Sequence, residues 1–168
     1  FASRRVVKHL AAPRVRTSST RGLGAFANVF AIESFMDELA AEAGTDPAAL
    51  RMAHLQDPRA REVVSRAAAV RTAWRARTSP GSGVGLAFAR YKNLQTYCAV
   101  VVKVRVDSES ASISLLEAAI VADAGRAVDR DGLAHQLEGG FVQAASWTLR
   151  EEVAFDAGGR TTADWQSY

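Results

Sequence analysis

The sequence has few of the residues that bind metals or form disulfides. Its 168 residues include one cysteine, Cys98, and three histidines, His9, His54 and His135, that are not spaced as metal ligands. A single cysteine can neither form an internal disulfide nor hold an iron–sulfur cluster. Any redox chemistry must therefore rely on a non-protein cofactor and on another polypeptide for electron transfer.

Long apolar runs and a strong net charge are also missing. No apolar run is long enough to span a bilayer, and no signal-peptide pattern is visible. The formal net charge is only +3, without the aromatic and basic stripe of a nucleic-acid-binding surface. The basic residues are densest near the N-terminus: Arg4, Arg5, Lys8, Arg14, Arg16 and Arg21. We therefore predict no membrane span and no nucleic-acid partner. The composition, 48% hydrophobic and 23% charged, is typical of a globular domain with a buried core.

The first half of the chain has the pattern of three helices. Asp46-Pro47 and Asp57-Pro58 are helix-start signals, and the second predicts a helix from about Pro58 to Trp74. Before them, an apolar stripe predicts a first helix, with Asn28 as its N-cap and Gly44 at its end. The stripe consists of Ile32, Phe35, Met36, Leu39, Ala40 and Ala43, and acidic residues lie mostly opposite: Glu33, Asp37, Glu38 and Glu42. Residues 1–20 are predicted to be an extended strand or a loop.

The pattern changes after Pro80 from helical periodicity to alternation. Strands are predicted at Val84–Tyr91, Tyr97–Val106 and Ile113–Asp123, and the turn at Asp107–Ser110 makes the last two an antiparallel hairpin. A long helix follows, from about Leu133 to Val153. We predict one α+β domain over residues 1–168, with helices in residues 1–78. Residues 79–168 then form a small, mainly antiparallel sheet packed on the long helix.

The stretch Gln136-Leu137-Glu138-Gly139-Gly140-Phe141-Val142-Gln143 is the strongest candidate site. Gln136, Gly140 and Gln143 recur at helical spacing and therefore share a face. A glycine inside a helix costs about 1 kcal/mol relative to alanine, so two glycines indicate that a ligand or another element approaches the backbone closely. The flanking amides can donate and accept hydrogen bonds with a polar heterocycle. A tight helix crossing with two capping glutamines is the alternative.

Three shorter motifs also have structural explanations. Arg21 lies in a turn of small residues, where a guanidinium beside exposed N–H groups could hold an anion or a carbonyl; a surface arginine is the alternative. Asp123–Arg126 predicts a strand-to-helix turn with a structural carboxylate. Gly81–Gly85 looks like a dinucleotide loop, but it precedes a strand instead of opening a helix, so we do not assign it to nucleotides.

Taken together, the motifs resemble the molybdenum-binding subunit of the xanthine dehydrogenase/aldehyde oxidase family. Some details are most similar to the beta subunits of isoquinoline 1-oxidoreductases. The resemblance covers nearly the whole chain, and the agreement of several ordered motifs makes it specific. The motifs are Arg21–Gly24, Ile32–Ala40, Asp46–Arg51, Gly85–Asn93, Asp123–Arg126, Gln136–Gln143, Ala145–Leu149 and Glu151-Glu152.

The resemblance implies a molybdopterin cofactor, in its cytosine dinucleotide form in bacteria. It implies hydroxylation of an aldehyde or an N-heterocycle with oxygen from water, and electron transfer to an iron–sulfur subunit. It also implies that Arg21, Gln136, Gly139 and Gly140 lie at the cofactor and that Leu23 contacts the substrate. The compartment is then the cytoplasm or the periplasm of a bacterium.

The sequence departs from the family in two ways. The family's essential glutamate, in a Gly-x-Gly-Glu segment, has no counterpart here, and the first cofactor-binding half is absent. We therefore assign no catalytic residue and no protein metal ligand. The chain starts at Phe1, and we expect a fragment that is inactive alone and exposes apolar surface where the remaining domains of the large subunit dock. A non-catalytic assembly or docking module with the same fold is the alternative.

Overall fold

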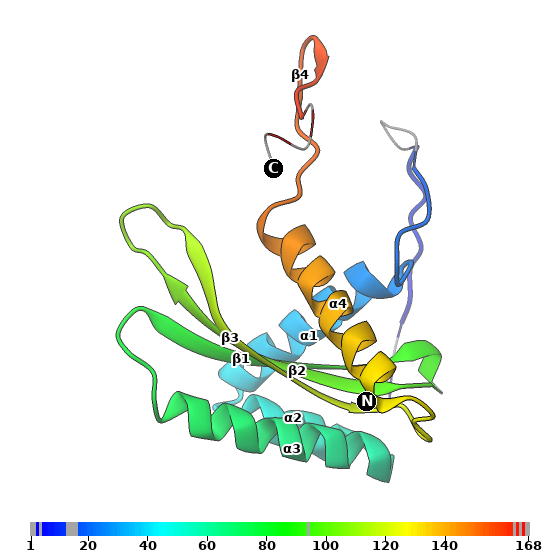
Figure 1. Cartoon of the computed structure of the whole chain (residues 1–168), viewed down its shortest axis with the longest axis vertical. Coiled ribbons are helices and arrows are strands. Elements are labelled where there is room, and N and C mark those ends of the chain that lie inside the picture. The colour runs from blue at the N-terminus through cyan, green and yellow to red at the C-terminus, as the bar shows by residue number, and fades with distance from the viewer. Residues whose placement is uncertain are drawn as a thin grey trace.

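Three helices occupy the first half of the chain, as predicted (Figure 1). The computed structural model describes residues 3, 5–12, 17–93, 95–162, 164 and 166. The first helix, α1, spans Ala25–Glu42, α2 spans Pro47–His54 and α3 spans Pro58–Arg75. The described residues before Arg21 form no helix or strand, in agreement with the predicted loop. Arg4, Pro13, Arg14 and Arg16 of that predicted loop lie outside the described residues.

The two aspartate–proline signals work as predicted. Asp46 Oδ1 accepts hydrogen bonds from two N–H groups of the first turn of α2, at 2.9 and 3.2 Å, and Asp57 Oδ1 does the same for α3 at 2.9 and 3.4 Å. Gly44 ends α1 with a φ of +59°, and this left-handed turn lets the N–H groups of Gly44 and Thr45 reach the Ala41 and Ala40 carbonyls of the helix. The prediction that Asn28 caps α1 is wrong. The helix begins one turn earlier at Gly24, whose carbonyl accepts the Asn28 N–H at 3.1 Å.

The apolar stripe of α1 is only partly covered. Met36 and Ala40 are buried, whereas Ile32 and Phe35 are exposed. Glu33, predicted on the solvated face, is instead half-buried: it accepts the Arg51 Nε–H at 2.8 Å and the Phe88 N–H at 2.7 Å. That part of the prediction is wrong because the buried guanidinium of Arg51 needs a carboxylate partner. The acidic residue therefore ties α1 to α2 and to the sheet.

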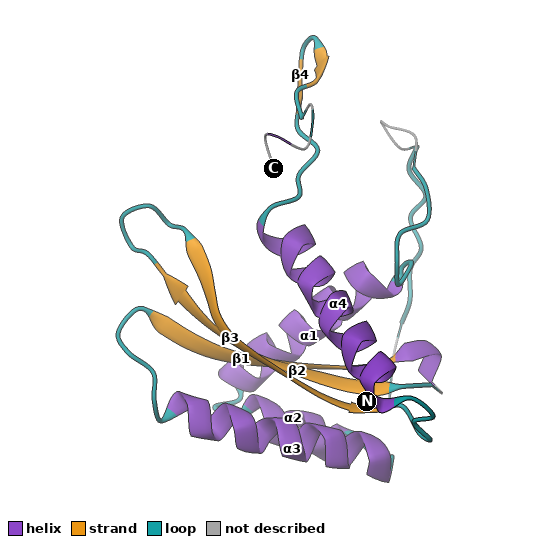
Figure 2. Cartoon of the chain, in the orientation of Figure 1, coloured by secondary structure: helices purple, strands orange, loops and turns teal. Residues whose placement is uncertain are grey.

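The second half forms the predicted antiparallel sheet (Figure 2). Its strand order is β1-β2-β3, with β1 at Ser82–Arg90, β2 at Tyr97–Val106 and β3 at Ile113–Asp123. A short 3-10 helix, Tyr91–Asn93, links β1 to β2. The β2–β3 loop starts at Asp107, whose carboxylate accepts N–H bonds from the next turn at 2.7 and 3.0 Å. The predicted strand alternation and hairpin are confirmed.

The last part of the chain contains the predicted long helix. This helix, α4, spans Arg130–Leu149 and contacts β3, so the predicted α+β class is confirmed. A small hairpin follows, made of β4 at Phe155–Asp156 and β5 at Gly159–Arg160. Among the described residues, no helix has both the length and the apolar character needed to cross a membrane.

The two faces of the sheet are covered to different extents. The α3 helix packs on one face and forms the core there, with Ala60, Val63, Ala67, Leu86, Tyr97, Ala99 and Val101. The opposite face, from which α4 rises in Figure 1, also carries apolar residues. We call it the valine face, and it consists of Gly83, Gly85, Ala87, Val100, Val102, Val104, Ala118 and Ile120. None of its residues is buried.

Candidate functional site

The α4 helix is positioned by its first turn and by β3. The Asp129 side chain caps the helix by accepting the Gly132 N–H at 3.0 Å, and Asp131 adds negative charge where the helix dipole favours it. A Cβ at residue 132 would lie only 2.5 Å from Asp129 Oδ2, so glycine lets the cap approach closely. Because α4 has no buried residue, its sides remain open to other groups.

The Arg21 turn precedes α1 and has unusual backbone angles. The turn is closed by a bond from the Leu23 N–H to the Thr20 carbonyl at 3.0 Å, and both Gly22 and Leu23 have positive φ, +84° and +52°. A branched residue in this region costs about 1–3 kcal/mol. The Leu23 side chain is 57% exposed. The turn therefore holds Leu23 outward in a conformation that its side chain disfavours.

Arg21 meets α4 at two of the predicted positions. Its Nη2 donates a 3.2 Å hydrogen bond to Gln136 Oε1, although the two residues are 115 positions apart. A Cβ at Gly140 would lie 3.9 Å from the same Nη2, so the guanidinium rests against the bare backbone there. The structure therefore brings Arg21, Gln136 and Gly140 together, which we call the Arg21 junction. It places Gly139 apart, exposed and with nothing within 4 Å of an added Cβ.

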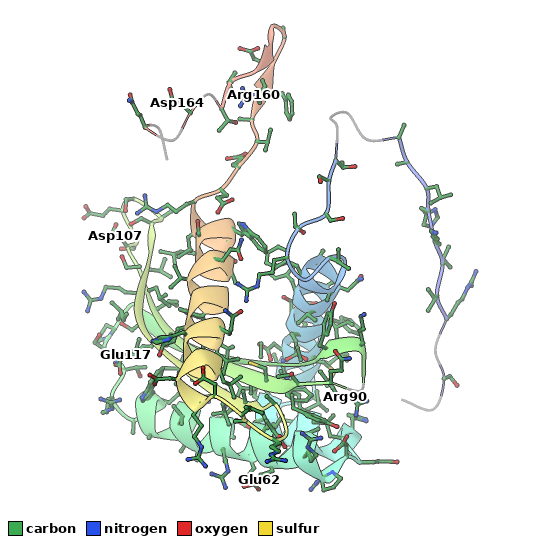
Figure 3. The ribbon with its side chains drawn as sticks, turned by 45° about the vertical axis from the view of Figure 1, so that its right-hand side comes forward. Glu62, Arg90, Asp107, Glu117, Arg160 and Asp164 are labelled. Atoms are coloured by element: carbon green, nitrogen blue, oxygen red, sulfur yellow. The ribbon has the colours of Figure 1, made fainter. Side chains whose placement is uncertain are left out.

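A groove runs from the Arg21 junction along the two helices. Its volume is about 400 Å³ and its lining is mostly apolar. Phe26 of α1 and Trp147 of α4 close it with an edge-to-face contact, 5.0 Å between ring centres and 86° between planes. Figure 3 shows the α1 and α4 ribbons standing beside each other above the sheet. Residues lining the groove are Arg21, Gly22, Ala25, Phe26, Val29, Phe30, Gly140, Gln143, Ala144 and Trp147.

Sequence reasoning missed the aromatic part of this groove. Phe26, Phe30 and Trp147 were not assigned to the site. A signal was available for one of them, because Trp147 follows Gln143 by four positions and continues the face that carries Gln136 and Gly140. Leu23, assigned to the substrate, is not among the described residues that line the groove.

The donor set of the junction suits a polar, anionic or carbonyl-rich ligand with a flat ring. A guanidinium offers several N–H donors in a planar fork, and the amides of Gln136 and Gln143 each add a donor and an acceptor. The aromatic groove beside them favours an apolar or planar group. These residues therefore fit a pterin-like heterocycle carrying phosphate. Among the described residues, no group of three or more metal-ligating side chains lies together.

The turn before α4 holds a structural carboxylate, as predicted. Asp123 pairs with Arg59 through two bonds of 2.7 Å and accepts the Gly125 N–H at 2.9 Å. Arg59 also lies over the Tyr97 ring, 4.5 Å from its centre, and Tyr97 donates its hydroxyl to Asp57 at 2.8 Å. The Arg59 hydrogen bonds, followed by that of Gly125, lower the pKa of Asp123 from 3.8 to about 2. This cluster ties the end of β3 to the start of α3.

Acid is therefore expected to weaken the domain partly through Asp123. Because its folded pKa lies below its unfolded one, its contribution is complete above about pH 4 and is lost as the pH falls toward 2. The half-exposed pair makes the effect small. Urea unfolding at pH 7 and pH 3 should show a smaller pH-dependent loss for Asp123→Asn than for the wild type. The control Glu152→Gln should keep the wild-type loss. If Asp123→Asn loses as much unfolding free energy between pH 7 and pH 3 as the wild type, the lowered pKa of Asp123 does not contribute to acid sensitivity.

Cys98, the lone cysteine, lies on the same side of the sheet as the valine face, near the start of β2. Burial raises the pKa of its thiol. The thiol is therefore mostly protonated near neutral pH and is a poor nucleophile there. Cys98 is not among the described residues that line the groove.

The fold and the Arg21 junction define a mixed helix-and-sheet domain in which a guanidinium and an amide lie beside a mostly apolar groove. The chain belongs to the family of molybdopterin cofactor-binding domains, whose model matches residues 14–168. It is 36% identical over 171 residues to the B subunit of nicotinate dehydrogenase from Pseudomonas putida, covering 93% of this chain and 14% of that protein. It is 31% identical over 152 residues to the beta subunit of isoquinoline 1-oxidoreductase from Brevundimonas diminuta, covering 88% of this chain and 19% of that protein. The chain thus spans less than a fifth of either relative, and the family resemblance is confirmed.

Proposed function

We propose that this chain is part of a molybdenum hydroxylase and forms one wall of its cofactor site. The observation that carries the proposal is the Arg21 junction. Arg21, Gln136 and Gly140 come from distant parts of a chain that matches the cofactor-binding family over residues 14–168, and they converge on one surface. In this proposal Gln136 and Arg21 bind the molybdopterin cofactor, Gly139 and Gly140 let it or a neighbouring segment approach α4, and Leu23 faces the substrate.

The reaction we propose is the hydroxylation of a ring or aldehyde carbon. The substrate carbon gains an oxygen from water and loses two electrons, two protons are released, and an iron–sulfur partner subunit accepts the electrons. When bound, the cofactor, in cytosine dinucleotide form, would transfer the water-derived oxygen to the substrate and carry the two electrons away. One relative is named for nicotinate and the other for isoquinoline, both nitrogen heterocycles, which supports an N-heterocycle over an aldehyde.

This chain's own residues act by binding and orientation. The Arg21 fork favours the negatively charged groups of a dinucleotide, and Gln136 presents an amide to ring atoms that donate and accept. We assign the family's essential glutamate to another part of the subunit. We therefore propose that the chain alone is inactive. The remaining domains of that subunit are its first partners.

Gln136→Ala should reduce cofactor occupancy in the polypeptide that the complete gene encodes. Loss of hydrogen bonds worth about 0.5–1.5 kcal/mol each lowers cofactor affinity by about 2–10-fold. We expect a lower molybdenum content by mass spectrometry, with turnover per bound molybdenum largely kept. Gln56→Ala, an exposed glutamine outside the junction, is the control.

Two outcomes would count against the proposal. Full molybdenum content with lost turnover in Gln136→Ala would place the residue in the chemistry instead of in cofactor binding. A wild-type polypeptide that binds no molybdenum cofactor would leave the non-catalytic assembly module as the better explanation of the fold.

A further inference from the structure

We propose that the valine face is the docking surface for one apolar-faced helix from the rest of the polypeptide to which this domain belongs. The helix would pack beside α4, over β1 and β2. This inference rests on the proposed function, in which the chain is part of a larger subunit. It concerns a surface that neither the Arg21 junction nor the groove uses.

The valine face has the character of an interior surface. All eight of its residues are apolar or glycine, and the register places Gly85 opposite Val102 and Val102 opposite Ala118, so they form one continuous patch. The opposite face is buried at Leu86, Ala99 and Val101 under α3, whereas no residue of the valine face is buried. Strands that are apolar on both sides are typical of sheets covered by helices on both faces.

The α4 helix covers only the β3 side of this face. Its Ala134, Leu137 and Phe141 lie over Ala118 and Ile120, with a hollow of about 370 Å³ between them. Three strands at about 4.8 Å spacing, with their side chains, present a face wider than one helix of about 10 Å diameter. The strip above β1 and β2 lies between α1, which contacts β1, and α4, which contacts β3, and none of its valine-face residues is buried.

The floor of that strip is shaped for bulky side chains. Gly83 would have nothing within 4 Å of an added Cβ, and Gly85 only the Val102 methyl at 3.9 Å. Glycine and Ala87 on β1 lie beside valines on β2, so this part of the face has little side-chain bulk and no charge. Leucine, isoleucine or phenylalanine from a helix would fill it without an unpaired charge on either side.

A second copy of this chain is a poorer occupant. Two sheets pack face to face at about 10 Å, and α4 rises from the valine face and blocks that approach (Figure 1). A single helix can lie beside α4. The chain spans only 14% and 19% of its two relatives. The rest of such a polypeptide contains many residues that could supply this helix.

Thiol labelling tests whether the rest of the polypeptide covers the valine face. Val102→Cys in a Cys98→Ser background puts one thiol at the centre of the valine face. We expect labelling to be at least about tenfold slower in the complete polypeptide than in the 168-residue chain, since covered sites react only through opening. Val128→Cys, in a loop residue that is 94% exposed, should label at similar rates in both. Equal rates for Val102→Cys would overturn the proposal.

Charge insertion gives an independent readout. Val102→Glu should lower the folded yield of the complete polypeptide several-fold, while Val128→Glu does not. In the 168-residue chain alone, Val102→Glu should leave the folded fraction unchanged and reduce self-association. A discrete dimer of the chain that Val102→Glu dissociates would make a second copy the occupant and overturn the proposal. Molybdenum content of the wild-type polypeptide tests the proposed function separately, because cofactor can be present whether or not the valine face is covered.

Discussion

Replacing Arg51 with alanine is expected to cost the domain about 3–5 kcal/mol of its free energy of unfolding, as for other buried ion pairs that lose one partner. Arg51 is only 3% exposed and donates four hydrogen bonds. They go to the Glu33 carboxylate at 2.8 Å, the Glu33 carbonyl at 3.0 Å, Asp37 at 2.7 Å and the Pro47 carbonyl at 3.0 Å. Without the guanidinium, the half-buried Glu33 carboxylate loses its countercharge, and the link between α1 and α2 is lost.

The same geometry makes lysine a poor replacement. A guanidinium reaches two residues on α1 and one at the start of α2 with separate N–H groups, whereas an ammonium is a single point of charge. Arg51→Lys should therefore recover only part of the loss. Arg66→Ala is the matched control, since its pair with Glu62 is exposed and worth at most about 0.5 kcal/mol. Urea unfolding measures all three variants. If Arg51→Ala lowers the free energy of unfolding by less than about 1 kcal/mol, the four hydrogen bonds of Arg51 do not stabilise the domain as proposed.

Leucine at either of the two neighbouring glycines of α4 is expected to lower molybdenum content in the complete polypeptide, although the two substitutions should affect the isolated chain differently. At Gly140 a Cβ meets Arg21 at 3.9 Å, an ordinary contact, so alanine fits, but the longer leucine must push the guanidinium away from Gln136. At Gly139 nothing lies within 4 Å of an added Cβ, so Gly139→Leu should stabilise the isolated chain by about 0.5–1 kcal/mol through helix propensity.

In the complete polypeptide both leucines should lower molybdenum content severely, by tenfold or more, if the cofactor or a supporting segment lies against this side of α4. Gly140→Ala should have a mild effect. The measurements are urea unfolding of the chain and molybdenum per polypeptide in the complete protein. Full molybdenum content in Gly139→Leu would remove Gly139 from the proposed site, and the same result in Gly140→Leu would remove the Arg21 junction.

The sequence predicted the features that depend on neighbouring residues. Asp46 and Asp57 were recognised as caps because a cap acts within three residues, and the strand alternation of β2 was visible for the same reason. The shared face of Gln136 and Gly140 follows from helical spacing alone, and the structure turns that face toward Arg21. The wrong prediction at Asn28 also concerns local sequence, since several small residues nearby can begin a helix; the structure has Gly24 at the N-cap, directly after the turn closed at Thr20.

The features that sequence reasoning missed depend on contacts between distant segments. Glu33 was placed in solvent because nothing within α1 indicates its bonds to Arg51, 18 residues away, or to Phe88, 55 residues away. The contact of Phe26 with Trp147 depends on how α1 crosses α4, which no pattern within either helix specifies. The alternation predicted for Tyr97–Val106 is confirmed, but only the packed structure shows that α3 covers the face opposite the valines.

The absence of buried residues in α4 has a consequence for how the Arg21 junction behaves over time. Local opening costs least where few apolar contacts are broken, and α4 and the first turns of α1 have far fewer than the α3–sheet core. The junction can therefore open many times for each global unfolding event. A ligand that binds only the closed form shifts this balance by mass action, by about 2.7 kcal/mol at 100 times its dissociation constant. The two helices would then become ordered in proportion to ligand occupancy, so the ligand would complete the folding of its own binding surface.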